Sequence, residues 1–177
     1  MIADPDELDR FLAEVVSEDW HFQHDAGRPA AEMVAERIAE FPAHAPLIAA
    51  WAERFHESIP GPVDGMPELL DRLAASGIPL YAITNFGPDF WASFRPTQPM
   101  LAHFRDIVVS GNERLTKPDA AIFHLAERRF GHRPETMLFI DDSLANVAAA
   151  RACGWHAHHF TGAAALAAEL RARRLLD

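Results

Sequence analysis

Apolar residues recur with two different periods along this chain, and the period changes near residue 60. Before that point they repeat every three or four positions, which predicts three successive amphipathic helices. We expect these helices over residues 5–16, 29–41 and 44–59. From Gly61 onward, short apolar runs alternate with helical segments. The pattern therefore predicts a helical unit over 1–60 and an α/β unit over 61–177.

In the second part, Gly77, Gly131 and Gly154 each end a predicted helix. Helices are expected over 68–76, 118–130, 143–153 and 163–174, and strands over 78–83, 107–109, 136–140 and 155–160. The segment around 87–88 is interpreted as a turn. Helices between buried strands favour parallel crossovers, so the predicted fold class is α/β, with a doubly wound parallel sheet. Ligands of such sheets bind beyond the carboxyl ends of the strands, where Thr84 and Asp141 are expected.

Charge and cysteine content narrow the function classes. The chain has 177 residues and a formal net charge of −10, which argues against nucleic acid or an anionic membrane as a partner. Its single cysteine, Cys153, excludes an internal disulfide and fits a reducing compartment. No apolar run reaches membrane-spanning length, and the first residues do not resemble a signal peptide. We expect a cytoplasmic protein.

The most informative stretch is 137–143, Met-Leu-Phe-Ile-Asp-Asp-Ser. An apolar run of strand length brings Asp141 and Asp142 to the start of an alanine-rich helix. Paired carboxylates in that position are suited to a hard cation such as Mg²⁺. Adjacent aspartates can also simply cap the next helix, and both interpretations stay open at this point.

Three motifs occur in order: Ala-Ile-Thr-Asn at 82–85, Leu-Thr-Lys-Pro-Asp-Ala-Ala-Ile-Phe at 115–123, and Phe-Ile-Asp-Asp-Ser at 139–143, with Asn146 following. Together they resemble the haloacid dehalogenase superfamily of hydrolases, and within it the phosphatases that carry a helical cap. The resemblance covers essentially the whole chain and implies a Rossmann-like core with residues 1–60 as the cap. It also implies phosphoryl transfer through an aspartyl-phosphate.

The resemblance assigns phosphate contacts to three residues. Thr84 would supply a hydroxyl and Asn85 an amide to the phosphoryl oxygens, and Lys117 would supply the compensating positive charge. Each motif alone also has a structural explanation, since Thr-Asn after a strand often forms a turn and Lys-Pro often precedes a helix.

The same resemblance implies a metal site. Asp141, and with it Asp142, would hold Mg²⁺, while Ser143 and Asn146 would support the loop. The histidines at 156, 158 and 159 suggest a second metal site, but they lack an obvious third ligand, so we interpret them as surface or packing residues. The four tryptophans, Trp20, Trp51, Trp91 and Trp155, are also interpreted as packing residues.

The chain departs from the family pattern at its start. The family's first motif is a buried strand ending in Asp-x-Asp, whose first aspartate is the nucleophile. Asp4-Pro5-Asp6 has this spacing, but only three residues precede it, so we interpret Asp4 as a helix N-cap. Without that strand, the strands ending at Thr84 and Asp141 would leave backbone groups unsatisfied, at about 1–3 kcal/mol each. We therefore expect the sequence to be an N-terminally shortened hydrolase that lacks the nucleophile.

Three functions remain open. The first is a Mg²⁺-dependent phosphatase acting on a small phosphorylated metabolite. The second is a binding or regulatory protein without catalysis. The third is a metal-free haloacid dehalogenase, which the Asp141–Asp142 pair disfavours because a dehalogenating site needs no cation. Specificity is expected from residues 19–28, with Trp20, His21, His24 and Arg28 as candidate contacts, and from the loop 86–95. The sequence leaves the substrate and the oligomeric state open.

Overall fold

The computed structural model describes residues 2–177, and these form two compact units. The first unit contains residues 2–60, 85–97 and 109–114; the second contains residues 61–84, 98–108 and 115–177. One division between the units falls at residue 60, as predicted, but the first unit also includes two later segments. The assignment of residues 1–60 as a separate domain therefore stays a prediction. Within the described residues, no helix is both long enough and apolar enough to cross a membrane.

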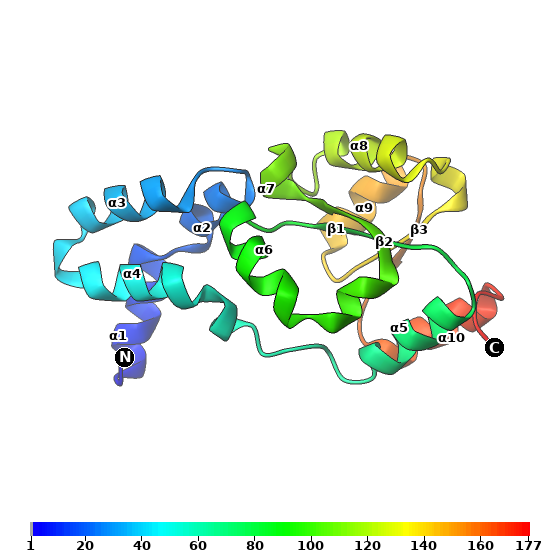
Figure 1. The fold of residues 1–177 in the computed structure, drawn as a ribbon, viewed down its shortest axis with the longest axis horizontal. Coiled ribbons are helices and arrows are strands. Elements are labelled where there is room, and N and C mark those ends of the chain that lie inside the picture. The colour runs from blue at the N-terminus through cyan, green and yellow to red at the C-terminus, as the bar shows by residue number, and fades with distance from the viewer. Residues whose placement is uncertain (1) are drawn as a thin grey trace. The chain divides into compact units, whose positions relative to one another are not determined.

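The regular structure of the first unit is almost entirely helical (Figure 1). Asp4 caps its first helix, because its Oδ1 accepts the backbone N–H of Asp6 at 2.9 Å. The predicted N-cap is therefore confirmed. The helices are α1 (Pro5–Arg10) with a π-helical continuation (Phe11–Val15), α2 (Glu18–Asp25), α3 (Ala30–Glu40), α4 (Ala45–Arg54), α6 (Pro88–Phe94) and α7 (Ser110–Glu113). Their apolar core contains Phe11, Val15, Val16, Trp20, Met33 and Ile48.

Three of these helices, α2, α6 and α7, were not predicted. The sequence of α2 is mostly polar, and its two apolar residues, Trp20 and Phe22, form no apolar stripe; the Ser17 hydroxyl caps the helix by accepting the N–H of Trp20. The segment at 87–88 was interpreted as a turn, but Pro88 occupies the first position of α6. Proline is favoured at that position because its fixed φ suits a helix start and its missing N–H has no partner to lose.

The second unit contains short strands that alternate with helices. The strands are β1 (Leu80–Thr84), β2 (Phe104–Val109), β3 (Leu138–Asp141) and β4 (His156–His159), and the main helices are α5 (Met66–Ala75), α8 (Ala120–Phe130), α9 (Leu144–Ala152) and α10 (Ala163–Ala172). The predicted α/β fold class is thus confirmed, with element ends that differ by at most three residues from the predicted ones. Phe123, fully buried, packs edge-on against Phe139 and Trp155 in the core.

The four strands form two separate two-stranded pairs. Among residues 2–177, β1 pairs only with β2, and β3 pairs only with β4. The β3–β4 pair is parallel, with Leu138 opposite His156 and Asp141 opposite His159. The sheet is divided because β1 and β3 are not neighbours, so each keeps one edge without a strand partner in the described chain.

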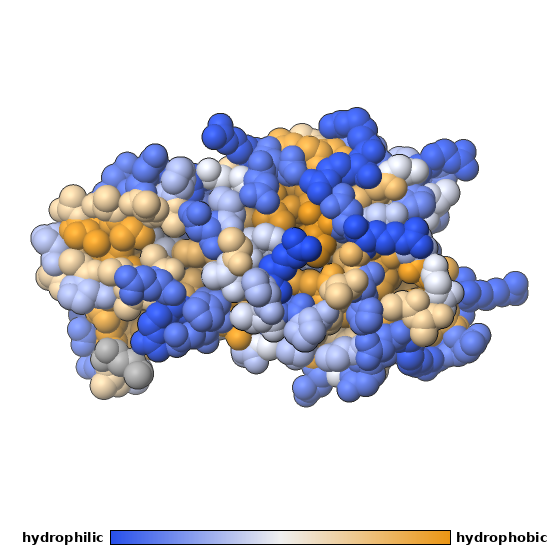
Figure 2. Space-filling model, in the orientation of Figure 1, coloured by the Kyte–Doolittle hydropathy of each residue, from blue (hydrophilic) through white to orange (hydrophobic). Residues whose placement is uncertain are grey.

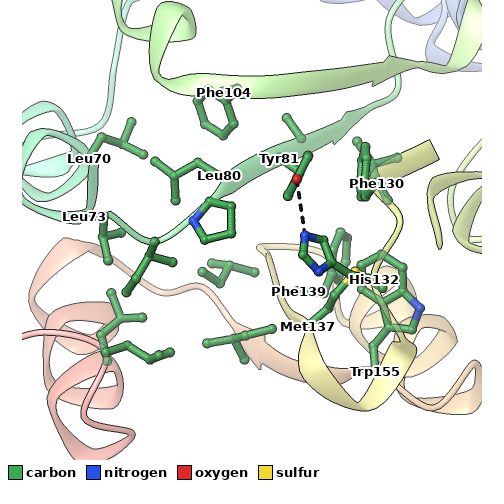
Figure 3. A pocket seen from close by; sticks show the side chains of 18 of the residues that line it. Leu70, Leu73, Leu80, Tyr81, Phe104, Phe130, His132, Met137, Phe139 and Trp155 are labelled. Carbon is green, nitrogen blue, oxygen red and sulfur yellow. Dashed lines mark hydrogen bonds between the residues drawn. The ribbon is translucent and has the colours of Figure 1, made fainter. Parts of the chain in front are cut away.

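An apolar groove of about 460 Å³ is lined by both of these strands (Figure 3). We call it the β1/β3 groove. Its lining includes Leu80 from β1, Phe139 from β3, Leu73 from α5 and Leu170 from α10. The Tyr81 hydroxyl and His132 Nε2 lie 3.2 Å apart and form a polar contact in this lining. In the space-filling view, apolar surface is visible between charged side chains (Figure 2).

We predict that Phe123→Ala lowers the free energy of unfolding by about 3–5 kcal/mol, because it removes a fully buried ring and leaves a cavity. Urea unfolding followed by circular dichroism measures this change. Leu144→Ala is the control, since Leu144 is 66% exposed and its loss should change stability by less than about 0.5 kcal/mol. A loss below about 1 kcal/mol for Phe123→Ala would contradict the described core.

Candidate active site

The carboxyl end of β3 leads directly into a capped helix. The strand ends at Asp141, and α9 begins at Leu144 with Ser143 as its N-cap. The Ser143 hydroxyl accepts the backbone N–H of Asn146 at 3.4 Å. An apolar strand followed by a capping serine therefore fixes the two aspartates in the turn between a buried strand and a helix N-terminus.

Asp141 is the most heavily bonded carboxylate in this turn. Its Oδ2 accepts the ammonium of Lys117 at 2.7 Å, and its Oδ1 accepts the N–H of Ser143 and the side-chain amide of Asn146, each at 2.9 Å. The Asp141 and Lys117 side chains are 7% and 11% exposed. The structure thus brings together four of the predicted site residues in one nearly buried, charge-assisted network.

Lys117 is positioned by the segment that leads into α8. Asp119, two residues later, is the N-cap of α8, and its carboxylate accepts the N–H of Ala121 at 2.9 Å. The Lys117 ammonium also lies 5.6 Å from the centre of the Phe139 ring. The interpretation of Lys-Pro as a simple helix boundary is therefore incomplete, because the lysine side chain is directed to the Asp141 carboxylate.

Asp142 follows Asp141 and is exposed. Its backbone carbonyl accepts the Nε2–H of His159 at 2.9 Å. Within residues 2–177, no three His, Cys, Asp or Glu side chains form a ready-made metal site. Mg²⁺ does not require one, since it usually binds through one or two carboxylates and takes its other ligands from water and substrate phosphate. The oxygen-rich Asp141–Asp142 pair fits that requirement.

Thr84 and Asn85 are consecutive residues at the end of β1. Thr84 is the last residue of the strand, and both residues are half-buried. Thr84 belongs to the second unit and Asn85 to the first. That these two side chains share one site with Asp141 stays a prediction.

The candidate specificity residues on and after α2 have mixed positions. Trp20 and His24 are buried, with 4% and 0% exposure, so both pack within the first unit. His21 is half-buried and stacks on Phe55 at a centroid distance of 4.8 Å. Arg28 donates to Gln23 at 2.7 Å and forms an ion pair with Glu36. The packing interpretation of Trp20 is confirmed, and a substrate contact by His21 or Arg28 stays a prediction.

A buried polar cluster that sequence reasoning missed surrounds the two residues after Asn85. The Ser110 hydroxyl accepts the N–H of Phe86 at 2.9 Å and lies 2.6 Å from the Asp25 carbonyl, to which it donates. The Gly111 N–H donates to the Phe86 carbonyl at 3.2 Å. Ser110 is 0% exposed. Its place directly after the apolar strand that ends at Val109 is the signal by which it could have been found.

The Asp25 carboxyl in this cluster has an unusual pKa. Burial raises the pKa to about 6, while the nearby His24 and a hydrogen bond from the Gly87 N–H act in the opposite direction. His21 Nε2 lies 3.7 Å from the Asp25 carboxylate, but burial lowers the pKa of His21 and so disfavours its charged form. The Asp25 charge is therefore only partly compensated.

These motifs agree with a comparison against known protein families. The model of the haloacid dehalogenase-like hydrolases matches residues 8–154 of the chain. The chain belongs to this family. The resemblance to this superfamily inferred from the three motifs is therefore confirmed.

The curated relatives of this haloacid dehalogenase-like chain are phosphatases. A phosphoglycolate phosphatase from Nitrosospira multiformis is 39% identical over 93 residues, which is 52% of this chain and 40% of that protein. A sesquiterpene phosphatase from Aspergillus oryzae is 33% identical over 107 residues, 60% of this chain and 54% of that protein. The chain thus spans about half the length of the curated relatives that it matches.

Solved structures show the same fold. A predicted haloacid dehalogenase (HAD)-like hydrolase from Porphyromonas gingivalis superposes with a TM-score of 0.71 at 20% identity. The superposition covers 93% of this chain and 88% of that one. A HAD-family enzyme from Bacteroides thetaiotaomicron superposes with a TM-score of 0.68 at 20% identity, covering 86% and 80%. The latter protein was crystallised with magnesium and inorganic phosphate. At this identity the likeness establishes the fold of the chain.

We predict that Asp25 makes stability fall as the pH rises from about 4 to about 6. Its pKa in the folded protein, about 6, lies above the ordinary value of 3.8, so the folded state binds more protons than the unfolded state across this range. The stabilising contribution is complete below pH 3.8 and is lost as the pH passes 6.

Thermal unfolding of the wild type and Asp25→Asn between pH 4 and 8 measures this effect, because the other titrating groups are common to both proteins. The difference in Tm, wild type minus variant, should decrease up to about pH 6 and then level off. A difference that stays constant over this range would show that Asp25 has an ordinary pKa.

Proposed function

We propose that this chain belongs to a Mg²⁺-dependent phosphatase that hydrolyses a small phosphate ester through an aspartyl-phosphate. The observation that carries the proposal is the network around Asp141, which joins Lys117, Ser143 and Asn146 at the carboxyl end of β3. An ammonium, hydroxyl and amide groups and two adjacent carboxylates are the groups that phosphoryl transfer requires, since this chemistry depends mainly on positioning and charge compensation.

Each residue has a role in this proposal. Asp141 and Asp142 would hold Mg²⁺, which supplies positive charge to the phosphoryl oxygens when bound. Lys117 compensates negative charge beside Asp141, while Thr84 and Asn85 donate hydrogen bonds to the phosphate. Ser143 and Asn146 keep the Asp141 carboxylate oriented, because both donate to its Oδ1.

We further propose that the nucleophilic aspartate is carried by a β-strand that lies in the β1/β3 groove. Asp4 does not supply it, because its carboxylate caps α1. The apolar lining of the groove and the edges of β1 and β3 that have no strand partner in the described chain support this part of the proposal. An extended segment placed there could form hydrogen bonds to both edges and cover the apolar lining, and few other ligands could do both.

The reaction then has two balanced steps. The first aspartate carboxylate attacks phosphorus, the bond to the ester oxygen breaks, and the alcohol leaves with a proton from the second carboxyl group of the strand's Asp-x-Asp. Water then gives a proton back to that second carboxylate and attacks the aspartyl-phosphate, which releases inorganic phosphate and restores the first carboxylate. On this proposal the chain alone provides the metal and phosphate contacts, and catalysis needs the strand.

The relatives limit the substrate class. Their names specify a sesquiterpene phosphate, phosphoglycolate and validoxylamine A 7′-phosphate. The alcohol parts of these three phosphate esters are chemically different. What these share is the phosphate ester, so we propose a small phosphorylated metabolite as substrate. Because all three are phosphatases, a dehalogenase or a protein without catalysis is less well supported.

We predict that Asp141→Asn lowers Mg²⁺ affinity at least tenfold, because it removes the negative charge of the central ligand. Isothermal titration calorimetry with MgCl₂ measures the change. Asp64→Asn, at an exposed loop position of the same unit, is the matched control and should leave the affinity unchanged.

Circular dichroism should accompany the titration, because Asp141→Asn also leaves the Lys117 ammonium without its ionised partner. Asp142→Asn serves as a second variant that does not touch this ion pair. Folded variants of both aspartates that bind Mg²⁺ like the wild type would overturn the metal assignment.

A further inference from the structure

Three segments of the first unit meet at the two residues that follow Asn85. The Phe86 N–H donates to the Ser110 hydroxyl, and the Phe86 carbonyl accepts the Gly111 N–H. The next N–H, that of Gly87, donates to the Asp25 carboxylate. The Ser110 hydroxyl in turn donates to the Asp25 carbonyl at 2.6 Å. Two consecutive amides are therefore held by two side chains from distant parts of the sequence.

Neither glycine in this cluster leaves room for a side chain. A Cβ atom added at Gly87 would lie 1.8 Å from the imidazole of His24, and one added at Gly111 would lie 2.5 Å from Cδ of Pro88. His24 and Ser110 are both 0% exposed, so water does not compete for these hydrogen bonds. His24 is itself oriented, because its Nδ1–H donates to the Arg28 carbonyl at 2.8 Å.

We propose that Ser110 and Asp25 are positioning residues that fix the Thr84–Asn85 segment for phosphate binding. This inference rests on the proposed function, which assigns the phosphate contacts to Thr84 and Asn85. Neither Ser110 nor Asp25 needs to touch the phosphate. They act through the backbone of Phe86 and Gly87, and a segment that is already ordered loses less entropy when it binds an anion.

The Ser110 hydroxyl suits this role because it donates and accepts at the same time. It accepts from the segment after β1 and donates to the segment after α2, so one atom joins both. Alanine removes both bonds and leaves a buried N–H and a buried carbonyl without their partner. Threonine keeps the hydroxyl. The pair Ser110→Ala and Ser110→Thr therefore separates the hydrogen bonds from the simple presence of a side chain.

The test measures binding of inorganic phosphate by calorimetry in the presence of Mg²⁺, together with amide hydrogen exchange of residues 84–88. In Ser110→Ala we expect phosphate affinity to fall about tenfold and the Phe86 amide to exchange about tenfold faster, which corresponds to one lost buried hydrogen bond. Mg²⁺ affinity should not change. Ser110→Thr should restore both phosphate affinity and protection.

Ser93→Ala is the matched control in the same unit, because the Ser93 hydroxyl only donates to the Phe90 carbonyl of its own helix. It should leave every readout unchanged. Asp25→Ala is a second variant in case Ser110→Ala does not fold, and it should speed exchange of the Gly87 amide. Asp25→Asn keeps an oxygen acceptor and should retain protection.

The outcomes distinguish this inference from the proposed function. If the wild type does not bind phosphate, the proposed function fails. If the wild type binds phosphate and folded Ser110→Ala and Asp25→Ala bind it equally well, the positioning role is overturned while the proposed function stands. Weaker phosphate binding with unchanged Mg²⁺ affinity, rescued by Ser110→Thr, supports the inference.

Discussion

The ion pair between Asp141 and Lys117 is the interaction on which the candidate site depends. It joins the end of β3 to the segment that enters α8, and both side chains are almost fully buried. An isolated carboxylate or ammonium would be costly in such a place, so each group needs the other. The N–H of Ser143 and the amide of Asn146 complete the hydrogen bonds of the carboxylate. Residues 141–146 thus both fix the orientation of the Asp141 carboxylate and cap α9, while Lys117 balances the charge of that carboxylate.

The second constraint comes from the strands. β1 and β3 each pair on one side only in the described chain, and both line the apolar β1/β3 groove. Sheet edges and apolar surface are each unfavourable in water, and here the two occur together. A strand in the groove would form hydrogen bonds to both sheet edges and would cover the apolar surface. In a parallel sheet, the carboxyl end of that strand would lie at the same edge as the carboxyl ends of β1 and β3. A strand in the groove would therefore bring its last residues to the sheet edge that carries Asp141.

The sequence was sufficient to predict the α/β class and the group around Asp141, because apolar strands, capping residues and charged motifs are local signals. It was not sufficient for α2, whose residues show no apolar stripe, or for α6, whose Gly-Pro start resembles a turn. It also missed Ser110 and Asp25. Their importance comes from contacts between segments that are far apart in the sequence, 24 residues for the bond from Phe86 to Ser110 and 85 for the bond from Ser110 to the Asp25 carbonyl, and no local pattern reports these.

The most direct test of the account is phosphate-ester hydrolysis by the chain mixed with a synthetic apolar peptide of strand length that ends in Asp-x-Asp. A matched peptide with Asn in place of the first Asp is the control. We predict that hydrolysis requires the Asp peptide and Mg²⁺ together and that a chelator abolishes it. Equal hydrolysis with the Asn peptide, or by the chain alone, would contradict the claim that the nucleophile is carried on a strand in the β1/β3 groove.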